Sequence, residues 1–163
     1  MMASGGLIAL PAWAREWKAS DLTAHHSSFS FDEQETLASV TDTIIPPGSA
    51  VGALAVGVDK FLQKLFDKCY EKNVRENVKI QLTGLENSAQ ATHGKSFVTC
   101  DQLQRKDLLL KLSASENKVE KDFFNLVKSE TIRGFNTSRE VMVGYHKFKL
   151  VPGHYHGCVD VKA

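Results

Sequence analysis

The sequence predicts an all-α protein, a small bundle of five or six helices followed by an irregular C-terminal tail. The main observation is the segment Val58–Tyr70, in which apolar residues recur every third or fourth position, as on one face of an α-helix. Other segments repeat this period more weakly, and no run of convincing length alternates as a β-strand does. The 163 residues, 42% of them hydrophobic, suffice for one domain with its own core.

Composition and charge exclude several classes of function. The formal net charge is +1, so the chain has no overall field that would attract nucleic acid or an anionic membrane. No apolar run reaches the roughly 20 residues that a transmembrane helix needs. The three cysteines form no C-x-x-C pair and fit no haem-attachment or iron–sulfur spacing. We therefore expect no nucleic-acid partner and no direct membrane span.

The first residues resemble the end of an export signal. A short apolar run, Gly5–Leu10, precedes Ala12-Trp13-Ala14, which has the A-x-A pattern of a signal cleavage site. The basic segment that opens such signals is missing, so an ordinary frayed or docked N-terminal segment is the alternative. We predict that residues 1–14 are the remnant of an export signal, that 15–28 form a mobile lead, and that 29–163 form a single helical domain with its tail from residue 145.

The first two helices have clear boundaries. Ser30 and Glu33 form an S-x-x-E capping box, and Pro46-Pro47-Gly48 ends the helix that follows. The glycines of the loop 48–57 match no phosphate-binding pattern, and the loop follows a helix rather than a strand. We expect the first helix to bury Leu37, Val40 and Ile44. We expect the second to bury Val58, Phe61, Leu62, Leu65, Phe66 and Cys69.

Weaker patterns predict the next two helices. The third spans Asn73–Ala91, and Gly94 supplies the left-handed conformation that commonly ends a helix. A fourth helix continues from Leu103 to Leu112 after a T-x-x-Q capping box that begins at Thr99.

The fifth helix, Lys118–Arg133, carries two apolar stripes, and Gly134 is its expected cap. Two stripes indicate burial on two sides, which suits either a central helix or one covered by a partner subunit. The first stripe contains Val119, Phe123, Leu126 and Val127, and the second contains Phe124, Ile132 and Phe135. A short sixth helix after Thr137 runs through Val143 and is closed by Gly144.

The tail changes character after residue 145. It lacks helical period and is rich in aromatic residues and histidines, so it must lie against another surface to be ordered. The sequence His154-Tyr155-His156-Gly157-Cys158 could supply imidazole and thiolate ligands to a metal, but no second ligand cluster accompanies it. We therefore expect no metal in this chain.

No residue is a convincing catalyst. The chain lacks a G-x-S-x-G elbow, and Asp42 is more readily a capping or loop-fixing carboxylate than a general acid. One of three cysteines is left over after any bridge within the chain. Cys69 is assigned to the core face of its helix and Cys100 to a helix start, so Cys158 in the tail is the candidate for pairing with another chain.

Four segments in order resemble the gluconate 2-dehydrogenase subunit 3 family. The segment 41–46 is similar to its D-T-I-I-P motif, and 52–61 to its G-A-x-x-x-G-V-x-x-F segment. Phe123-Phe124 with 131–138 resembles the F-F…T-x-x-G-[YF]-x-T-S stretch. Gly144-Tyr145 with 152–158 resembles the closing G-Y…P-G-x-Y-x-G-C.

The resemblance implies a non-catalytic small subunit with no cofactor of its own. Its partner would be a large FAD-dependent dehydrogenase of the glucose–methanol–choline type, which oxidises sugars, sugar acids or glycosides in the periplasm and often passes electrons to a cytochrome c subunit. Family members typically carry a twin-arginine signal, which this sequence lacks. On this interpretation Cys158 is a candidate intersubunit disulfide. The interface candidates are Phe124, Ile132, Phe135, Tyr145, Phe148, His154, Tyr155 and His156.

Two other interpretations remain open. One is a stand-alone enzyme or metal-binding protein that uses the His/Cys tail. The other is a helical chaperone that escorts a client during export and then leaves. Metal analysis and stable co-purification with a partner distinguish the three.

Overall fold

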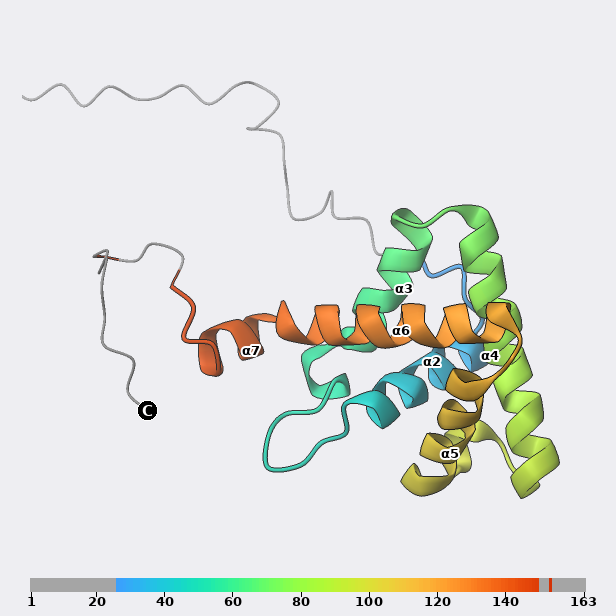
Figure 1. The fold of residues 1–163 in the computed structure, drawn as a ribbon. Coiled ribbons are helices and arrows are strands. Elements are labelled where there is room, and N and C mark those ends of the chain that lie inside the picture. Colours follow the sequence, from blue (N-terminus) through green and yellow to red (C-terminus); the bar gives the residue numbers. More distant parts are fainter. Residues whose placement is uncertain (1–25, 150–152, 154–163) are drawn as a thin grey trace, which may run out of the picture.

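A computed structural model describes residues 26–149 and residue 153 of the chain. In this part of the chain six α-helices and two short 3-10 helices occur, and no strand (Figure 1). The prediction of an all-α bundle is therefore confirmed. The elements are α2 (Phe31–Ile44), η2 (Leu54–Val56), α3 (Val58–Lys68), α4 (Lys72–His93), η3 (Phe97–Thr99), α5 (Gln102–Ala114), α6 (Lys118–Asn136) and α7 (Arg139–Gly144).

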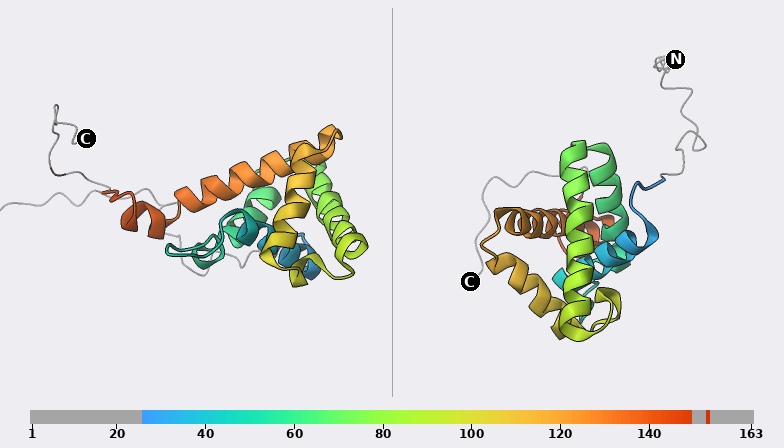
Figure 2. Two further views of the ribbon diagram at one scale, coloured as in Figure 1. Left: turned by 60° about the horizontal axis from the view of Figure 1, so that its bottom comes forward. Right: turned by 90° about the vertical axis from the view of Figure 1, so that its right-hand side faces the viewer.

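Two helices organise the bundle. α6 contacts α2, α3, α4 and α5, and α2 in turn also contacts α3, α4 and α5. In Figure 1, α6 crosses the front of the molecule with α3 above it and α4 and α5 at its far end. The left view of Figure 2 shows that α7 continues past the end of the packed helices. The sequence left two explanations for the two apolar stripes of the fifth helix, a central position or a partner subunit, and the contacts of α6 with α2, α3, α4 and α5 favour the central position.

The core forms where the apolar faces of these helices meet. Phe66 of α3 is fully buried, and its ring lies 6.2 Å from that of Phe29 and 5.4 Å from that of Tyr70, centroid to centroid. The predicted inner residues Leu37 and Val40 are also buried, while Ile44 is half-buried. The other fully buried large side chains include Leu62, Val78, Leu82, Leu85, Phe97, Phe123 and Val127. None of the helices described is long and apolar enough to cross a membrane.

Cys69 corrects one prediction, because its side chain is exposed rather than buried on the core face of α3. The helix ends at Lys68, and Cys69 is its C-cap residue. The helical period no longer dictates the direction of a side chain beyond the last helical residue. Val119 is a second correction, since it lies in the first turn of α6 and is 46% exposed.

The N-cap of α5 is also not the residue that the sequence suggested. Asp101 caps the helix, since its carboxylate accepts a hydrogen bond from the Gln104 amide at 2.9 Å and the Gln104 side chain accepts one from the Asp101 amide at 3.2 Å. Thr99 instead belongs to η3 and donates to the Ser96 carbonyl. The sequence contains two overlapping capping-box patterns, T-x-x-Q from Thr99 and D-x-x-Q from Asp101, and the helix uses the second.

Gly134 is not the cap of α6, because the helix continues to Asn136. The glycine is buried, and a Cβ atom placed on it would lie 2.6 Å from Cδ1 of Phe61 in α3. Gly134 therefore allows α6 and α3 to approach closely. The prediction that Gly134 caps the helix was wrong. The sequence around Gly134 does not show that Phe61 of another helix packs against it.

Candidate functional site

The end of the bundle that carries α7 exposes a group of apolar side chains. Ser138 caps α7, and Val141 is its one buried residue. Val143 is 55% exposed, and beyond the helix Tyr145 is 55% and Phe148 49% exposed. We call Val143, Tyr145 and Phe148 together the α7 surface.

Backbone hydrogen bonds hold this surface in place. The Tyr145 amide donates to the Val141 carbonyl and the Phe148 amide to the Met142 carbonyl, both at 2.9 Å. The Tyr145 hydroxyl accepts a bond from the Val51 amide at 3.4 Å, which ties α7 to the loop that follows α2. This loop and α7 lie on the same side of the bundle in Figure 1. The surface is therefore built on fixed backbone rather than on loose chain.

The predicted interface residues separate into three groups. Phe124 and Phe135 are partly buried and pack against the core of the bundle. Ile132, Tyr145 and Phe148 are exposed, Ile132 to 39%. The remaining interface candidates, His154, Tyr155 and His156, and the cysteine Cys158 lie outside the described residues. Val143 was not among the predicted residues, because the periodicity of a six-residue helix does not show which face is covered.

Asp42 joins two helices and caps neither. Its carboxylate lies 3.3 Å from Nη1 of Arg105 in α5, and both side chains are mostly buried. Arg105 also donates to the Ser39 carbonyl, and the Gln102 side chain donates to the Asp42 carbonyl at 3.2 Å. These bonds attach the start of α5 to the end of α2, so the carboxylate that was considered as a general acid is held in an ion pair. The sequence offered no local signal for Arg105 as its partner.

Several residues that carry the family resemblance are packing residues in this structure. Phe61 lies against Gly134, as described above, and the Arg133 guanidinium lies 5.7 Å from the centroid of the Phe61 ring. A Cβ atom on Gly52 would lie 2.7 Å from the backbone nitrogen of Pro47. The glycine therefore allows the two arms of the loop after α2 to pack closely against each other. Gly57 has a φ of +72°, which L-residues with a Cβ seldom adopt.

Tyr70 and Glu130 form a polar bridge between the turn that follows α3 and helix α6. The Tyr70 hydroxyl donates to Oε1 of Glu130 at 2.9 Å, and Arg133 pairs with the other carboxylate oxygen. Burial is the main cause that raises the pKa of Tyr70, and its hydrogen bond to Glu130 raises it further. The phenol therefore stays protonated and acts as a structural donor.

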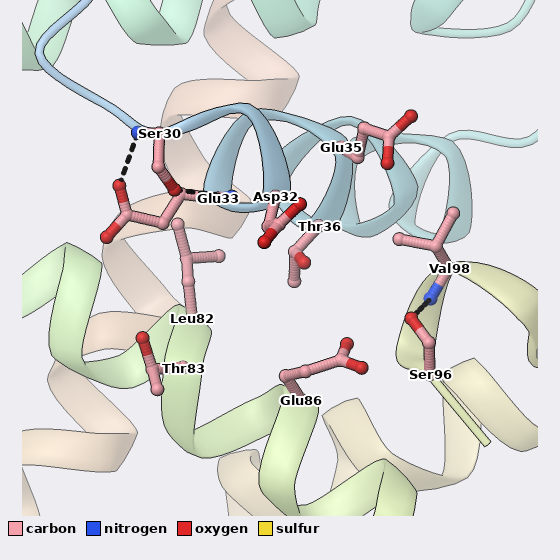
Figure 3. A pocket seen from close by; sticks show the side chains of 10 residues that line it. All are labelled: Ser30, Asp32, Glu33, Glu35, Thr36, Leu82, Thr83, Glu86, Ser96 and Val98. Atoms are coloured by element: carbon pink, nitrogen blue, oxygen red, sulfur yellow. Dashed lines mark hydrogen bonds between the residues drawn. The ribbon is translucent and has the colours of Figure 1, made fainter.

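A cavity of about 290 Å³ opens between the start of α2, the middle of α4 and η3. Figure 3 shows Asp32 and Thr36 reaching into it from α2, and Glu86 reaching toward them from α4 on the opposite side. Glu33 also lines it but closes the capping box of α2. Ser96 and Val98 close the side formed by η3. Within the described residues no group of three or more His, Cys, Asp or Glu side chains is arranged to hold a metal ion.

Cys100 is buried and Cys69 is exposed, and both are free thiols in the part of the chain that the structure describes.

Comparison with known proteins gives one family. The model of gluconate 2-dehydrogenase subunit 3 matches residues 31–153, a range that contains α2 through α7. No curated protein and no solved structure matches the chain. The family match covers most of the sequence, and it includes the first three segments on which the resemblance was based and the start of the fourth, whose residues 154–158 lie beyond it. The chain belongs to the gluconate 2-dehydrogenase subunit 3 family.

Proposed function

We propose that this chain is the non-catalytic small subunit of a flavin-dependent dehydrogenase complex. Its family is named for a dehydrogenase subunit. In this proposal the large subunit is of the glucose–methanol–choline type, holds the FAD and oxidises a sugar, a sugar acid or a glycoside. The small subunit binds no cofactor and stabilises its partner. A cytochrome c subunit would accept the electrons.

The observation that carries the proposal is the α7 surface. Helix α7 buries one side chain in its own fold and leaves Val143, Tyr145 and Phe148 exposed beside it. Burying an apolar side chain of this size stabilises a complex by roughly 1.5–3 kcal/mol. A short helix that projects from the bundle and presents apolar and aromatic groups is well suited to contact a larger protein. The occupant proposed for this surface is the large dehydrogenase subunit.

We also propose that the complex works in the periplasm and that the small subunit is exported together with the large one. Cys158 would form a disulfide with a cysteine of the large subunit. Two functions of other classes compete with this proposal, a transient export chaperone and a stand-alone protein that uses the His/Cys tail. A chaperone would not co-purify stably, and a metal-dependent protein would carry stoichiometric metal when isolated.

Val143→Asp is expected to weaken the complex at least tenfold, because it places a charge in a contact that loses its water. The measurement is size-exclusion chromatography of the chain co-expressed with its genomic neighbours, followed by the flavin absorbance of each fraction. Leu103→Asp is the matched control, since Leu103 is 78% exposed on α5 and lies outside the α7 surface. A complex that survives Val143→Asp as well as Leu103→Asp would contradict the assignment of the surface. A chain that elutes alone, folded and colourless would contradict the proposed function.

Cys158→Ser is expected to abolish a reducible band at the summed mass of the two subunits on a non-reducing gel. Cys158 is the cysteine that the sequence leaves for pairing with another chain. Cys69→Ser is the control, because Cys69 is an exposed free thiol and its loss should leave the band intact. A band that persists in Cys158→Ser, or disappears in Cys69→Ser, would assign the bond to another cysteine.

A further inference from the structure

The cavity between α2, α4 and η3 is lined by carboxylates and by no basic side chain. Asp32, Glu33, Glu35 and Glu86 line it together with Thr36, and no lysine or arginine does. Glu33 is occupied by the Ser30 amide, and Glu35 points away from the cavity in Figure 3. Asp32 and Glu86 are therefore the carboxylates that face one another across it. A cation placed between two carboxylates on facing walls would be attracted by both.

Thr36 provides a second, independent indication of a ligand. It is only 4% exposed, it lines the cavity, and Figure 3 shows its side chain directed into the space between Asp32 and Glu86. Among the described residues its hydroxyl has no hydrogen-bond partner, whereas Thr41 and Thr43 of the same helix donate to carbonyls three and four residues before them. A buried polar group normally has a partner. The Thr36 hydroxyl has no partner in the protein, and because it is not among the polar atoms shut off from solvent, it is open to the cavity and free to bond a ligand there.

The size and the donor pattern of the cavity favour an organic cation. A volume of about 290 Å³ is much larger than a metal ion requires, and the acidic side chains are not grouped as metal ligands. One oxygen of Glu86 already accepts from the Phe97 amide at 3.0 Å, which holds this carboxylate in position and leaves the other oxygen available. A planar guanidinium carries five N–H donors and no acceptor, so it can bond two carboxylates and a hydroxyl at once.

We propose that this cavity binds a guanidinium group, held by Asp32, Glu86 and the Thr36 hydroxyl. The group belongs either to an arginine side chain of a partner protein or to a small free guanidinium compound. Both present the same chemistry to the cavity. This site lies apart from the α7 surface and does not depend on the proposed function.

The test is a titration of the isolated full chain with N-acetyl-arginine amide at constant ionic strength, followed by amide NMR shifts. Saturable shifts are expected at Thr36, Glu86 and Val98. N-acetyl-citrulline amide, which has nearly the same shape and no charge, is expected to produce none. Absence of saturable shifts with the arginine compound, or equal shifts with the citrulline compound, would overturn the proposal.

Variants connect the binding to the named groups. Asp32→Asn and Glu86→Gln are each expected to weaken binding about tenfold, since each removes a charged acceptor. Asp32 lies in the exposed first turn of α2, so Asp32→Asn remains informative if Glu86→Gln disturbs the bond to Phe97. Thr36→Val is expected to weaken binding about threefold without any change of charge. Asp107→Asn, which neutralises an exposed carboxylate on α5, is the control. If it weakened binding as much as Asp32→Asn does, the probe would be attracted by the overall charge of the chain and not bound in the cavity, which would overturn the proposal.

A second titration, on the complex with the large subunit, identifies the source of the guanidinium. If the site no longer binds the probe, an arginine of the partner occupies it. If the site still binds, the ligand is a free compound. The titration of the isolated chain involves no partner, so its failure would leave the proposed function untouched. A failure to form the complex would likewise leave the cavity site untouched.

Discussion

Phe66→Ala is expected to lower the free energy of unfolding by about 3–5 kcal/mol, the largest change in stability among the variants proposed for this chain. Phe66 is fully buried in α3, and its ring contacts those of Phe29 and Tyr70. The substitution removes apolar area from the core and leaves a cavity that the surrounding helices can fill only in part. The measurement is urea denaturation of the isolated chain, followed by far-UV circular dichroism.

Phe31→Ala is the matched control for this prediction. Phe31 is 71% exposed at the first position of α2, so the same change of side chain should alter the free energy of unfolding by no more than about 0.5 kcal/mol. Equal losses in the two variants would show that the face of α3 containing Phe66 is not the core. The position of the α7 surface would then also be in question, because α7 extends from α6 and α6 packs on α3.

Gly134→Ala is expected to lower the free energy of unfolding by about 1–2 kcal/mol, although alanine is the better helix former. The added methyl group would lie 2.6 Å from the Phe61 ring, and such overpacking typically costs about 1–3 kcal/mol. The gain in helix propensity, about 0.5–1 kcal/mol, offsets only part of this. Urea denaturation again measures the change.

Gly84→Ala isolates the effect of the contact. Gly84 also lies inside a helix, but a Cβ atom there would meet nothing within 4 Å, so alanine should raise the free energy of unfolding by about 0.5–1 kcal/mol. Opposite signs at the two glycines are the expected result. The double variant Gly134→Ala with Phe61→Leu should recover part of the loss, because the leucine side chain can leave room for the methyl group. A destabilising Gly84→Ala, or a stabilising Gly134→Ala, would contradict the packing of α6 on α3.

The contact at Gly134 also bears on the proposed function. Gly134 lies near the end of α6 that leads into α7, and α7 packs mainly on α6. A shift of α6 away from α3 would therefore displace the α7 surface relative to the rest of the bundle. Gly134→Ala should then reduce both the stability of the chain and the formation of the complex. Gly84→Ala should reduce neither the stability nor the formation of the complex.

Local pattern in the sequence determined the class of the fold and most of its elements. The period of 3.6 in Val58–Tyr70 and the capping box at Ser30 arise from contacts between residues three or four positions apart. The α2 and α3 helices were therefore predicted close to their observed bounds, with Leu37, Val40 and Phe66 correctly placed in the core. The order of four short motifs also sufficed to indicate the family, which the match over residues 31–153 bears out.

Only the tertiary structure decided which residues meet across helices. The pairing of Asp42 with Arg105, the close approach of Phe61 to Gly134, and the cavity that places Thr36 opposite Glu86 each join different helices. Such contacts depend on the crossing angle and distance of two helices, and no local pattern encodes either quantity. The sequence by itself thus determined the helices and the family of this protein, while the arrangement of α6 on its neighbours decided which glycine is required, which carboxylates are paired and which apolar side chains are left exposed on α7.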